Sequence, residues 1–409
     1  MSIDYLALDE ELDKEEYLIC EYTVKSDLDI ETAGKRIAEE ESTGTWTRPT
    51  TLSEDIFESY GAKVTKAEGN RTRIGYPVID FSGDIGGIPQ ILSIVAGNLF
   101  GLDSLDGVRL VDVEIPPKIL KRYPGPQKGL KGLRQILDRP EKPLVGTIVK
   151  PKIGLPPKEF AEYVYEAGKG GLTNSKDDET LVDQDFCPLE ERVSAVSEKL
   201  DLLEEEDHKM IHAHNISTSA HEILEAADLA LENGARQLML DVLTVGFSGL
   251  QALAEDPSIK VPIHVHRAMH AAITKDPEHG ISMPVIAKLV RMAGGDALHT
   301  GTYGTGKMHA DISEELESKE ALLGDMHGLK RMMPVASGGL HPGLIPELMG
   351  KSGNDVQIQA GGGVAGHPEG VGAGAKALSQ SVDASFEGVP LDEFKKDHPE
   401  LKKALEKWS

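Results

Sequence analysis

The sequence predicts an α/β protein in which a (β/α)₈ barrel follows a smaller α+β domain of ferredoxin-like type. Eight short runs rich in Val, Ile and Leu occur after about residue 140, and longer amphipathic segments separate them. Eight strand–helix repeats over about 250 residues fit a closed barrel better than an open doubly wound sheet. No GxGxxG follows the first run, which also counts against a dinucleotide-binding fold.

The elements before the repeats are mixed in type, which predicts an α+β domain over residues 1–125. The expected strands are residues 17–24, 72–77 and 108–115, and the expected helices are residues 28–41 and 89–98. Residues 116–140 contain Pro124-Gly125-Pro126 and several lysines, and this composition indicates a linker.

The barrel with a C-terminal helical tail is expected over residues 126–409. Its strands are expected at residues 144–151, 172–179, 210–216, 237–245, 261–269, 297–302, 332–339 and 356–363. Its helices are expected at residues 157–167, 188–204, 220–233, 284–293 and 372–382.

The chain is acidic, since 43 Lys and Arg against 68 Asp and Glu leave a formal net charge of −25. This balance excludes binding of nucleic acid or an anionic membrane through bulk charge, but not a local cationic pocket. Ordinary solubility and adaptation to a saline cytoplasm both explain the acidity. Cys20 and Cys187 cannot build a disulfide framework or a zinc cage. With no apolar signal segment or membrane-length run, we expect a cytoplasmic protein.

Polar side chains gather where the expected barrel strands end. They are Lys150, Lys152, Lys176, Asp178, Glu179, His214, Asn215, His264, His266, Arg267, His299, Ser337-Gly338-Gly339 and Gly361-Gly362-Gly363. The carboxyl ends of barrel strands meet at one rim, which is where barrel enzymes hold their active sites. The sequence therefore predicts a catalytic barrel.

The segment Ser175-Lys176-Asp177-Asp178-Glu179 is either an exposed charged turn or a metal site. Because strand side chains alternate, Lys176 and Asp178 share one face, and Glu179 can join them as the strand ends. Two carboxylates suit a hard ion such as Mg²⁺. A lysine fits beside them if a partner neutralises it or if CO₂ carbamylates it, which creates a third carboxylate-like ligand.

Two further clusters carry cations to the same rim. Lys150 and Lys152 are either surface lysines or a site for an anionic substrate, and a lysine crowded by cations can act as a base. His264, His266, Arg267 and His270 place three histidines and an arginine within seven residues, which favours a functional role over a purely structural one. Arg267 also offers a forked donor set that suits phosphate.

Glycine-rich segments end the later strands. Residues 301–307 read GTYGTGK, which fits either a surface loop or a glycine-hinged lid with Lys307 at its tip, but not a P-loop. Ser337-Gly338-Gly339 and Gly361-Gly362-Gly363 are either tight turns or backbone N–H cradles for a phosphate.

Taken in order, these motifs resemble the large subunit of ribulose-1,5-bisphosphate carboxylase/oxygenase (Rubisco) across nearly the whole chain. In the barrel they are Lys150-Pro151-Lys152, Gly170-Gly171-Leu172 leading into Lys176-Asp177-Asp178-Glu179, His266-Arg267-Ala268-Met269-His270, the loop from His299 to Lys307, Ser337-Gly338-Gly339 and Gly361-Gly362-Gly363. Before the barrel they are Glu40, Ser42-Thr43-Gly44-Thr45-Trp46 and Gly97-Asn98. The short length and the run over residues 337–343 are more similar to the archaeal form III branch than to plant enzymes.

The resemblance implies Mg²⁺-dependent carboxylation of ribulose 1,5-bisphosphate by CO₂ and water to two 3-phosphoglycerates, with an oxygenase side reaction with O₂. It implies that Lys176 is carbamylated by an activator CO₂, binds Mg²⁺ together with Asp178 and Glu179, and takes the C3 proton. Supply of the substrate from AMP and nucleoside salvage is implied by the branch.

The resemblance also assigns the remaining site residues. Lys150 protonates C2 of the departing fragment, His266 is a further acid/base, and Lys307 closes over the site to stabilise the new carboxylate. Arg267 and His299 bind one phosphate. The other substrate residues implied in the barrel are Lys152, Ser337, Gly338, Gly339, Gln359, Gly361 and Gly362.

Four residues of the first domain are implied to act in the neighbouring subunit's site: Glu40, Thr45, Trp46 and Asn98. The smallest active unit is therefore expected to be a homodimer, alone or in an oligomer of dimers, with no small subunit, nucleic acid or membrane as partner.

The sequence departs from the plant pattern at three positions. Ile148 stands where a substrate-binding threonine is usual, and Met308-His309 replaces Leu-Glu after Lys307. These changes bear on lid dynamics and on CO₂/O₂ discrimination. A Rubisco-like enolase or isomerase of a phosphorylated ketose is the alternative function, and a non-catalytic barrel is another. Relatives of the first kind lose some of the lysines at 150 and 307 or of Glu40 and Asn98, all of which this chain keeps.

Overall fold

The computed structural model describes residues 3–83, 85–307 and 311–408. The chain divides into two compact units, Met1–Pro124 with Met269–Met292, and Gly125–Ala268 with Ala293–Ser409. The ranges expected from the sequence, 1–125 and 126–409, differ from this division in the segment Met269–Met292, which packs with the first unit.

The first unit is built on a five-stranded sheet in the order β10-β4-β1-β3-β2, in which β10 runs parallel to β4 and the other pairs are antiparallel. Its strands are β1 (Tyr17–Lys25), β2 (Lys63–Glu68), β3 (Arg71–Pro77), β4 (Gly107–Glu114) and β10 (Gly280–Ile281). Its helices are α1 (Ile30–Glu40), α2 (Glu54–Tyr60), η1 (Val78–Phe81), α3 (Gly87–Val95), η2 (Leu99–Gly101), α4 (Pro117–Leu120), α11 (Ala271–Thr274) and α12 (Met283–Ala293).

Local chemistry explains where α1 begins and which face it buries. The Asp29 side chain caps the helix by accepting a hydrogen bond from the backbone N–H of Thr32. Ala33, Ile37 and Ala38 are buried and form the apolar face expected of a surface helix. The helix ends at Glu40, close to where the sequence pattern predicted its end.

Polar contacts attach the segment Met269–Met292 to the first unit. Arg109 of β4 donates to the carbonyl oxygens of Thr274, at 3.0 Å, and Asp276. Lys288 of α12 pairs with Asp112 at 2.5 Å. These contacts explain why a segment that lies between two barrel strands in the sequence belongs to the other unit.

The second unit is a closed barrel of eight parallel strands in the order β11-β12-β13-β5-β6-β7-β8-β9, which confirms the predicted fold class. The strands are β5 (Leu144–Ile148), β6 (Asn174–Lys176), β7 (Ile211–Asn215), β8 (Gln237–Asp241), β9 (Ile263–His266), β11 (Ala297–Gly301), β12 (Met333–Ser337) and β13 (Gln357–Gln359). Each expected run contains one of these strands, but the strands are shorter than the runs, whose ends continue into loops or, after β8 and β13, reach the helices α9 and α15.

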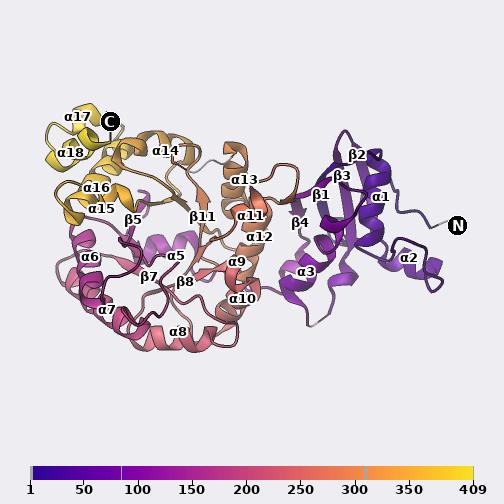
Figure 1. The fold of residues 1–409 in the computed structure, drawn as a ribbon, viewed down its shortest axis with the longest axis horizontal. Coiled ribbons are helices and arrows are strands. Elements are labelled where there is room, and N and C mark those ends of the chain that lie inside the picture. The colour runs from indigo at the N-terminus through magenta and orange to yellow at the C-terminus, as the bar shows by residue number, and fades with distance from the viewer. Residues whose placement is uncertain (1–2, 84, 308–310, 409) are drawn as a thin grey trace. The chain divides into compact units, whose positions relative to one another are not determined.

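Helices surround the ring of strands (Figure 1). They are α5 (Gly129–Ile136), α6 (Pro157–Lys169), α7 (Leu189–Glu205), α8 (Ile223–Glu232), α9 (Val242–Val245), α10 (Phe247–Glu255), α13 (Ile312–Leu323), η3 (Pro342–Leu344), α14 (Ile345–Ser352), α15 (Gly362–Ala365), α16 (Val371–Glu387), α17 (Leu391–Phe394) and α18 (Pro399–Lys407). Within the described residues, no helix combines the length and the apolar character that crossing a membrane requires.

Helix α5 closes one end of the barrel. Its Leu130 and Leu133 form an apolar cluster with Leu144 and Met333, which begin β5 and β12. The expected linker over residues 116–140 was therefore wrong in part, because it contains α4 and α5. The amino ends of the strands are sealed by apolar packing, and the polar site lies at their carboxyl ends.

Candidate active site

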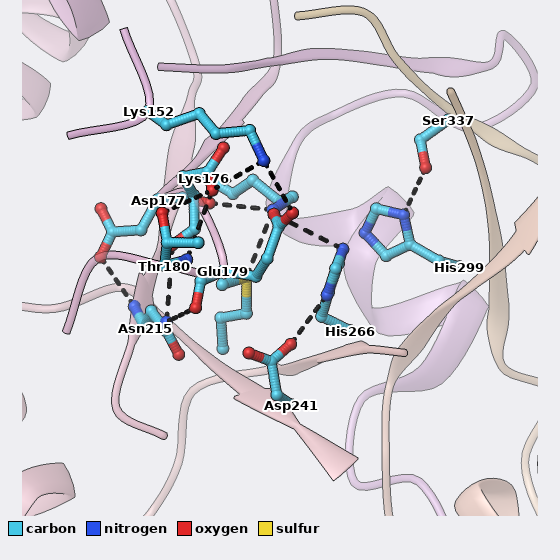
Figure 2. Close-up of polar contacts among 12 residues, drawn as sticks. Lys152, Lys176, Asp177, Glu179, Thr180, Asn215, Asp241, His266, His299 and Ser337 are labelled. Carbon is cyan, nitrogen blue, oxygen red and sulfur yellow. Dashed lines mark hydrogen bonds and ion pairs between the residues drawn. The ribbon is translucent and has the colours of Figure 1, made fainter. Parts of the chain in front are cut away.

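Lys176 is the last residue of β6, and its side chain is only 1% exposed. Its Nζ donates to the backbone carbonyl of Asp177 at 2.9 Å and lies 3.6 Å from Sδ of Met239 and 3.9 Å from Oε2 of Glu179 (Figure 2). The structure thus places a buried amine beside the Glu179 carboxylate, which turns in where β6 ends.

Burial lowers the pKa of the Lys176 ammonium, and the charges of Glu179 and Asp178 only partly oppose this. The uncharged amine is the nucleophilic form of lysine, so a lowered pKa favours attack on an electrophile such as CO₂. Burial also opposes ionisation of Glu179, but the neighbouring Lys176 and His266 hold the pKa of Glu179 down at about 2. A pKa of about 2 leaves the Glu179 carboxylate ionised at neutral pH beside the buried Lys176 side chain.

Lys150 and Lys152, from the loop after β5, extend to the same carboxylates. Lys150 Nζ lies 2.6 Å from Oδ2 of Asp178, whose side chain is 1% exposed. Lys152 Nζ lies 3.4 Å from Oε1 of Glu179 and 3.7 Å from Oδ1 of Asp178. The structure therefore joins three lysines and two carboxylates, which we call the lysine–carboxylate cluster: Lys150, Lys152, Lys176, Asp178 and Glu179.

His266 ends β9 and is oriented by Asp241, an acid that was not among the predicted site residues. Its Nδ1 lies 2.7 Å from Oδ1 of the buried Asp241, and its Nε2 lies 3.8 Å from Oε2 of Glu179 (Figure 2). A carboxylate at Nδ1 holds a proton there and leaves Nε2 facing the lysine–carboxylate cluster. Burial lowers the pKa of His266, so its neutral form is favoured.

His299 links the barrel interior to the turn after β12. Its Nδ1 lies 2.6 Å from Oγ of Ser337, and its Nε2 lies 2.8 Å from Nε2 of His264. Burial lowers the pKa of both imidazoles well below the ordinary value. Neutral rings can share a single proton between the two Nε2 atoms, which fixes the orientation of both rings and of Ser337.

Behind this rim lies a fully buried polar layer. The Asp177 carboxylate is 3.1 Å from Nη2 of Arg192 and 2.8 Å from Nε2 of His212, and it accepts the backbone N–H of Asn215 at 2.7 Å. Oγ of Ser175 lies 2.6 Å from Nδ1 of His212. Asp177 points away from the lysine–carboxylate cluster and anchors the end of β6 from behind.

In the described part of the chain, one set of His and carboxylate side chains has ligand atoms close enough for a metal ion, namely Asp177, His212 and His214, within 4.8 Å of one another. The hydrogen bonds above already occupy the Asp177 carboxylate, and the guanidinium of Arg192 repels a cation there. This set is therefore a supporting network, distinct from the expected ligands Lys176, Asp178 and Glu179.

Arg267 follows β9, and burial lowers its pKa to about 10. The opposing charge is Glu315 of α13, which accepts the backbone N–H groups of Thr302 at 3.1 Å and Gly304 at 3.0 Å. Glu315 was not predicted as a site residue, although it holds the base of the glycine-rich loop. The exposed Lys307 is held by its backbone N–H, which donates to the Gly338 carbonyl at 3.0 Å. Met308 and His309 lie outside the described residues.

The glycine turns lie at the same end of the barrel. Gly338 and Gly339 have φ values of 122° and 82°. A residue with a side chain would be strained in this backbone conformation. Gly361 caps α15, and a Cβ there would lie 3.1 Å from Cε of Lys150. The buried side-chain amide of Gln359, at the end of β13, has no hydrogen-bond partner among the described residues.

The remaining predicted residues lie in the first unit. Glu40 ends α1, Thr45 and Trp46 follow in the next loop, and Asn98 precedes η2. Asn98 Nδ2 donates to Oε1 of Glu40 at 3.3 Å, so the structure brings these two together. Trp46 is 86% exposed, which is unusual for so large an apolar side chain.

A closed parallel barrel whose strand ends carry a buried amine, ionised carboxylates and oriented histidines is a catalytic barrel. Residues 129–408 match the model of the ribulose bisphosphate carboxylase large chain, catalytic domain, and residues 4–119 match that of its N-terminal domain. The chain belongs to the ribulose bisphosphate carboxylase large-chain family.

Named relatives and solved structures are similar to this chain over 99% of its length. Ribulose bisphosphate carboxylase of Pyrococcus furiosus is 42% identical over 412 residues, covering 99% of this chain and 97% of the relative. The octameric Rubisco of Pyrococcus horikoshii has a TM-score of 0.93 and 40% identity, covering 99% of this chain and 96% of that one. The dimeric archaeal Rubisco of Hyperthermus butylicus has a TM-score of 0.90 and 37% identity, covering 99% of both.

Proposed function

We propose that the protein carboxylates ribulose 1,5-bisphosphate with CO₂ and water to give two molecules of 3-phosphoglycerate. The observation that carries this proposal is the buried Lys176, whose pKa is lowered, beside the carboxylates of Asp178 and Glu179. The names of full-length relatives support the same reaction.

The donor set of the lysine–carboxylate cluster fits Mg²⁺ together with a carbamate on Lys176. Mg²⁺ prefers hard oxygen ligands, and the two carboxylates together with a carbamate would supply them. Lys176 is buried, and its lowered pKa favours the neutral amine that CO₂ can modify. Lys176, Asp178 and Glu179 would hold the ion, which supplies electrostatic stabilisation of negative charge on substrate oxygens.

The chain's own residues then divide the proton transfers. Loss of the C3 proton at the Lys176 side chain gives an enediolate, and its C2 forms the new bond to CO₂. Water adds at C3, and cleavage of the C2–C3 bond leaves a carbanion at C2 that takes its proton from Lys150. His266, with Nε2 free and Nδ1 held by Asp241, exchanges protons with the substrate hydroxyls. Lys307 stabilises the carboxylate formed from CO₂.

Phosphate binding explains how an acidic protein takes a bisphosphate. Arg267 and His299 serve one phosphate, and the turns at Gly338-Gly339 and Gly361-Gly362 offer backbone N–H groups. Lys152, Ser337, Gln359, Thr45 and Trp46 complete the proposed substrate contacts. The net charge of −25 is then a property of the surface, and the site itself is locally cationic.

The proposal also covers a side reaction, the source of the substrate and the oligomeric state. We assign an oxygenase side reaction with O₂, and supply of the substrate by AMP and nucleoside salvage. We also propose a homodimer as the minimal active unit, in which Glu40, Thr45, Trp46 and Asn98 complete the site of the neighbouring subunit. The exposed Trp46 and the dimeric and octameric assemblies named for two relatives support this.

Incubation of the purified protein with labelled bicarbonate, Mg²⁺ and ribulose bisphosphate under anaerobic conditions is expected to give labelled 3-phosphoglycerate. One label should enter for every two product molecules, because only one of the two carboxyl groups derives from CO₂. Reactions without the bisphosphate serve as controls. Consumption of the substrate without incorporation of label would instead establish an enolase or isomerase, and no consumption would refute both activities.

A further inference from the structure

Three consecutive acidic residues, Glu39, Glu40 and the C-cap residue Glu41, lie at the end of α1, and of these only Glu40 has been given a role. The three side chains differ in environment. Glu41 is 7% exposed, Glu40 is half-buried and faces Asn98, and Glu39 pairs with Arg36 on the surface at 3.2 Å. Burying a carboxylate costs free energy unless its oxygens are hydrogen-bonded, so the partners of Glu41 are informative.

The Glu41 carboxylate binds the backbone of the segment that carries Asn98. Its Oε1 accepts the N–H groups of Asn98 at 2.7 Å and of Leu99 at 2.6 Å, and its Oε2 accepts the N–H of Gly97 at 3.1 Å. Three consecutive N–H groups on one carboxylate form a charge-assisted set, which is stronger than neutral hydrogen bonds.

The glycine at position 97 makes this approach possible. A Cβ built on Gly97 would lie 2.9 Å from Oε2 of Glu41 and 2.3 Å from the carbonyl oxygen of Ser93. Any side chain there would push the segment off the carboxylate. The contact therefore depends on both residues: the carboxylate of Glu41 accepts the hydrogen bonds, and the absence of a side chain at Gly97 leaves room for it.

This contact determines how two proposed site residues lie relative to each other. Glu40 and Asn98 are 58 positions apart in the sequence, and their own hydrogen bond is 3.3 Å long and exposed to water. Glu41 follows Glu40 directly at the end of α1, and its carboxylate accepts a hydrogen bond from the backbone N–H of Asn98. The buried carboxylate, rather than the exposed hydrogen bond, has the strength to hold the pair in register.

We propose that Glu41 is a positioning residue, which fixes Asn98 against Glu40 and thereby shapes the part of the substrate site that one subunit gives to its neighbour. This inference rests on the proposed function. Glu41 does not touch the substrate, and its effect on turnover is transmitted through the backbone of residues 97–99.

Graded substitution tests the inference. Glu41→Gln keeps the shape and one acceptor oxygen but turns an N–H donor towards Gly97, whereas Glu41→Ala removes all three hydrogen bonds. We expect kcat/KM for ribulose bisphosphate to fall about tenfold in the first variant and about a hundredfold in the second, since small misplacements of reacting groups have such effects. Glu39→Gln, one residue before Glu40, is the matched control and should stay within about twofold of wild type.

Amide hydrogen exchange provides a readout that is independent of activity. The N–H groups of residues 97–99 should exchange faster in both Glu41 variants and at the wild-type rate in Glu39→Gln. Unchanged exchange in Glu41→Ala, or faster exchange with unchanged kcat/KM, would overturn the inference. An inactive wild type would instead overturn the proposed function, so the two failures can be told apart.

Complementation separates positioning from a general loss of folding. When Glu41→Ala is co-expressed with Lys176→Met, half of the randomly assorted dimers are mixed, and each mixed dimer has one intact site out of two. About a quarter of the wild-type activity should return, although each variant alone is defective. No recovery from a folded, mixed dimer would show that Glu41 does not act across the subunit boundary.

Discussion

Lys176→Met is expected to abolish carboxylation while the protein stays folded. In the proposed mechanism this side chain is carbamylated by CO₂ and takes the C3 proton, so we expect its removal to lower turnover about 10³-fold or more. Methionine is unbranched and apolar, and Met239 Sδ already lies 3.6 Å from the Lys176 Nζ. The melting temperature should therefore stay within about 3 °C of wild type. Incorporation of labelled bicarbonate and differential scanning calorimetry measure the two effects.

Two further lysine variants sharpen the test. Lys176→Arg introduces a guanidinium that stays charged and offers no neutral amine at ordinary pH, so it should be as inactive as Lys176→Met. Lys169→Met changes an exposed lysine of α6 that pairs with Glu206 at 2.9 Å, and it should keep full activity. Turnover retained in Lys176→Met would contradict the assignment of Lys176.

Asp177→Ala is expected to destabilise the protein by about 3–5 kcal/mol, because it leaves the buried Arg192 guanidinium without its carboxylate. Both side chains of this pair are fully buried, and the same carboxylate also holds His212 and the backbone N–H of Asn215. The Arg192 guanidinium and the hydrogen bond with His212 keep the pKa of Asp177 below its ordinary value despite the burial, so the carboxylate is ionised at neutral pH. Urea unfolding followed by circular dichroism gives the free energy.

Glu206→Ala is the control for this prediction. Its ion pair with Lys169 is exposed on both sides, so its loss should cost no more than about 1 kcal/mol. Equal destabilisation by the two substitutions would show that the Asp177–Arg192 pair does not anchor the end of β6.

The barrel was predictable because eight runs rich in Val, Ile and Leu recur along the chain and polar residues follow them, although β6 (Asn-Ser-Lys) and β13 (Gln-Ile-Gln) are themselves largely polar. The apolar character spans β5 and β12, for example, and the polar residues follow where the strands leave the barrel. Several elements were not predicted, among them α2, β2, α10 and α13, and for two others, α5 and β10, the reason is clear from the sequence. Helix α5 lies in a segment whose proline, glycine and lysine content is typical of a linker. Strand β10 has only two residues, too few to show any periodicity.

Some residues of the site were also predictable from the sequence, and others were not. Lys176 and Asp178 could be paired from strand alternation alone, and the other rim residues follow from the order of the strands. Asp241 could not, because its contact with His266 depends on the register between β8 and β9, which sets these two residues opposite each other. Glu315 and Glu41 bind backbone N–H groups of distant segments, and no sequence spacing encodes such contacts.

The apolar plug that α5 makes with the first residues of the strands has a consequence for how such a protein can change over time. A five-residue strand such as β5 spans about 16 Å, so the plug and the rim are separated by a full strand length. Substitutions at Leu130, Leu133 or Leu144 alter the free energy of unfolding without touching a residue that handles substrate. Adaptation to temperature can therefore proceed at the sealed end while selection on catalysis acts on the other, and the two traits can evolve with little trade-off between them.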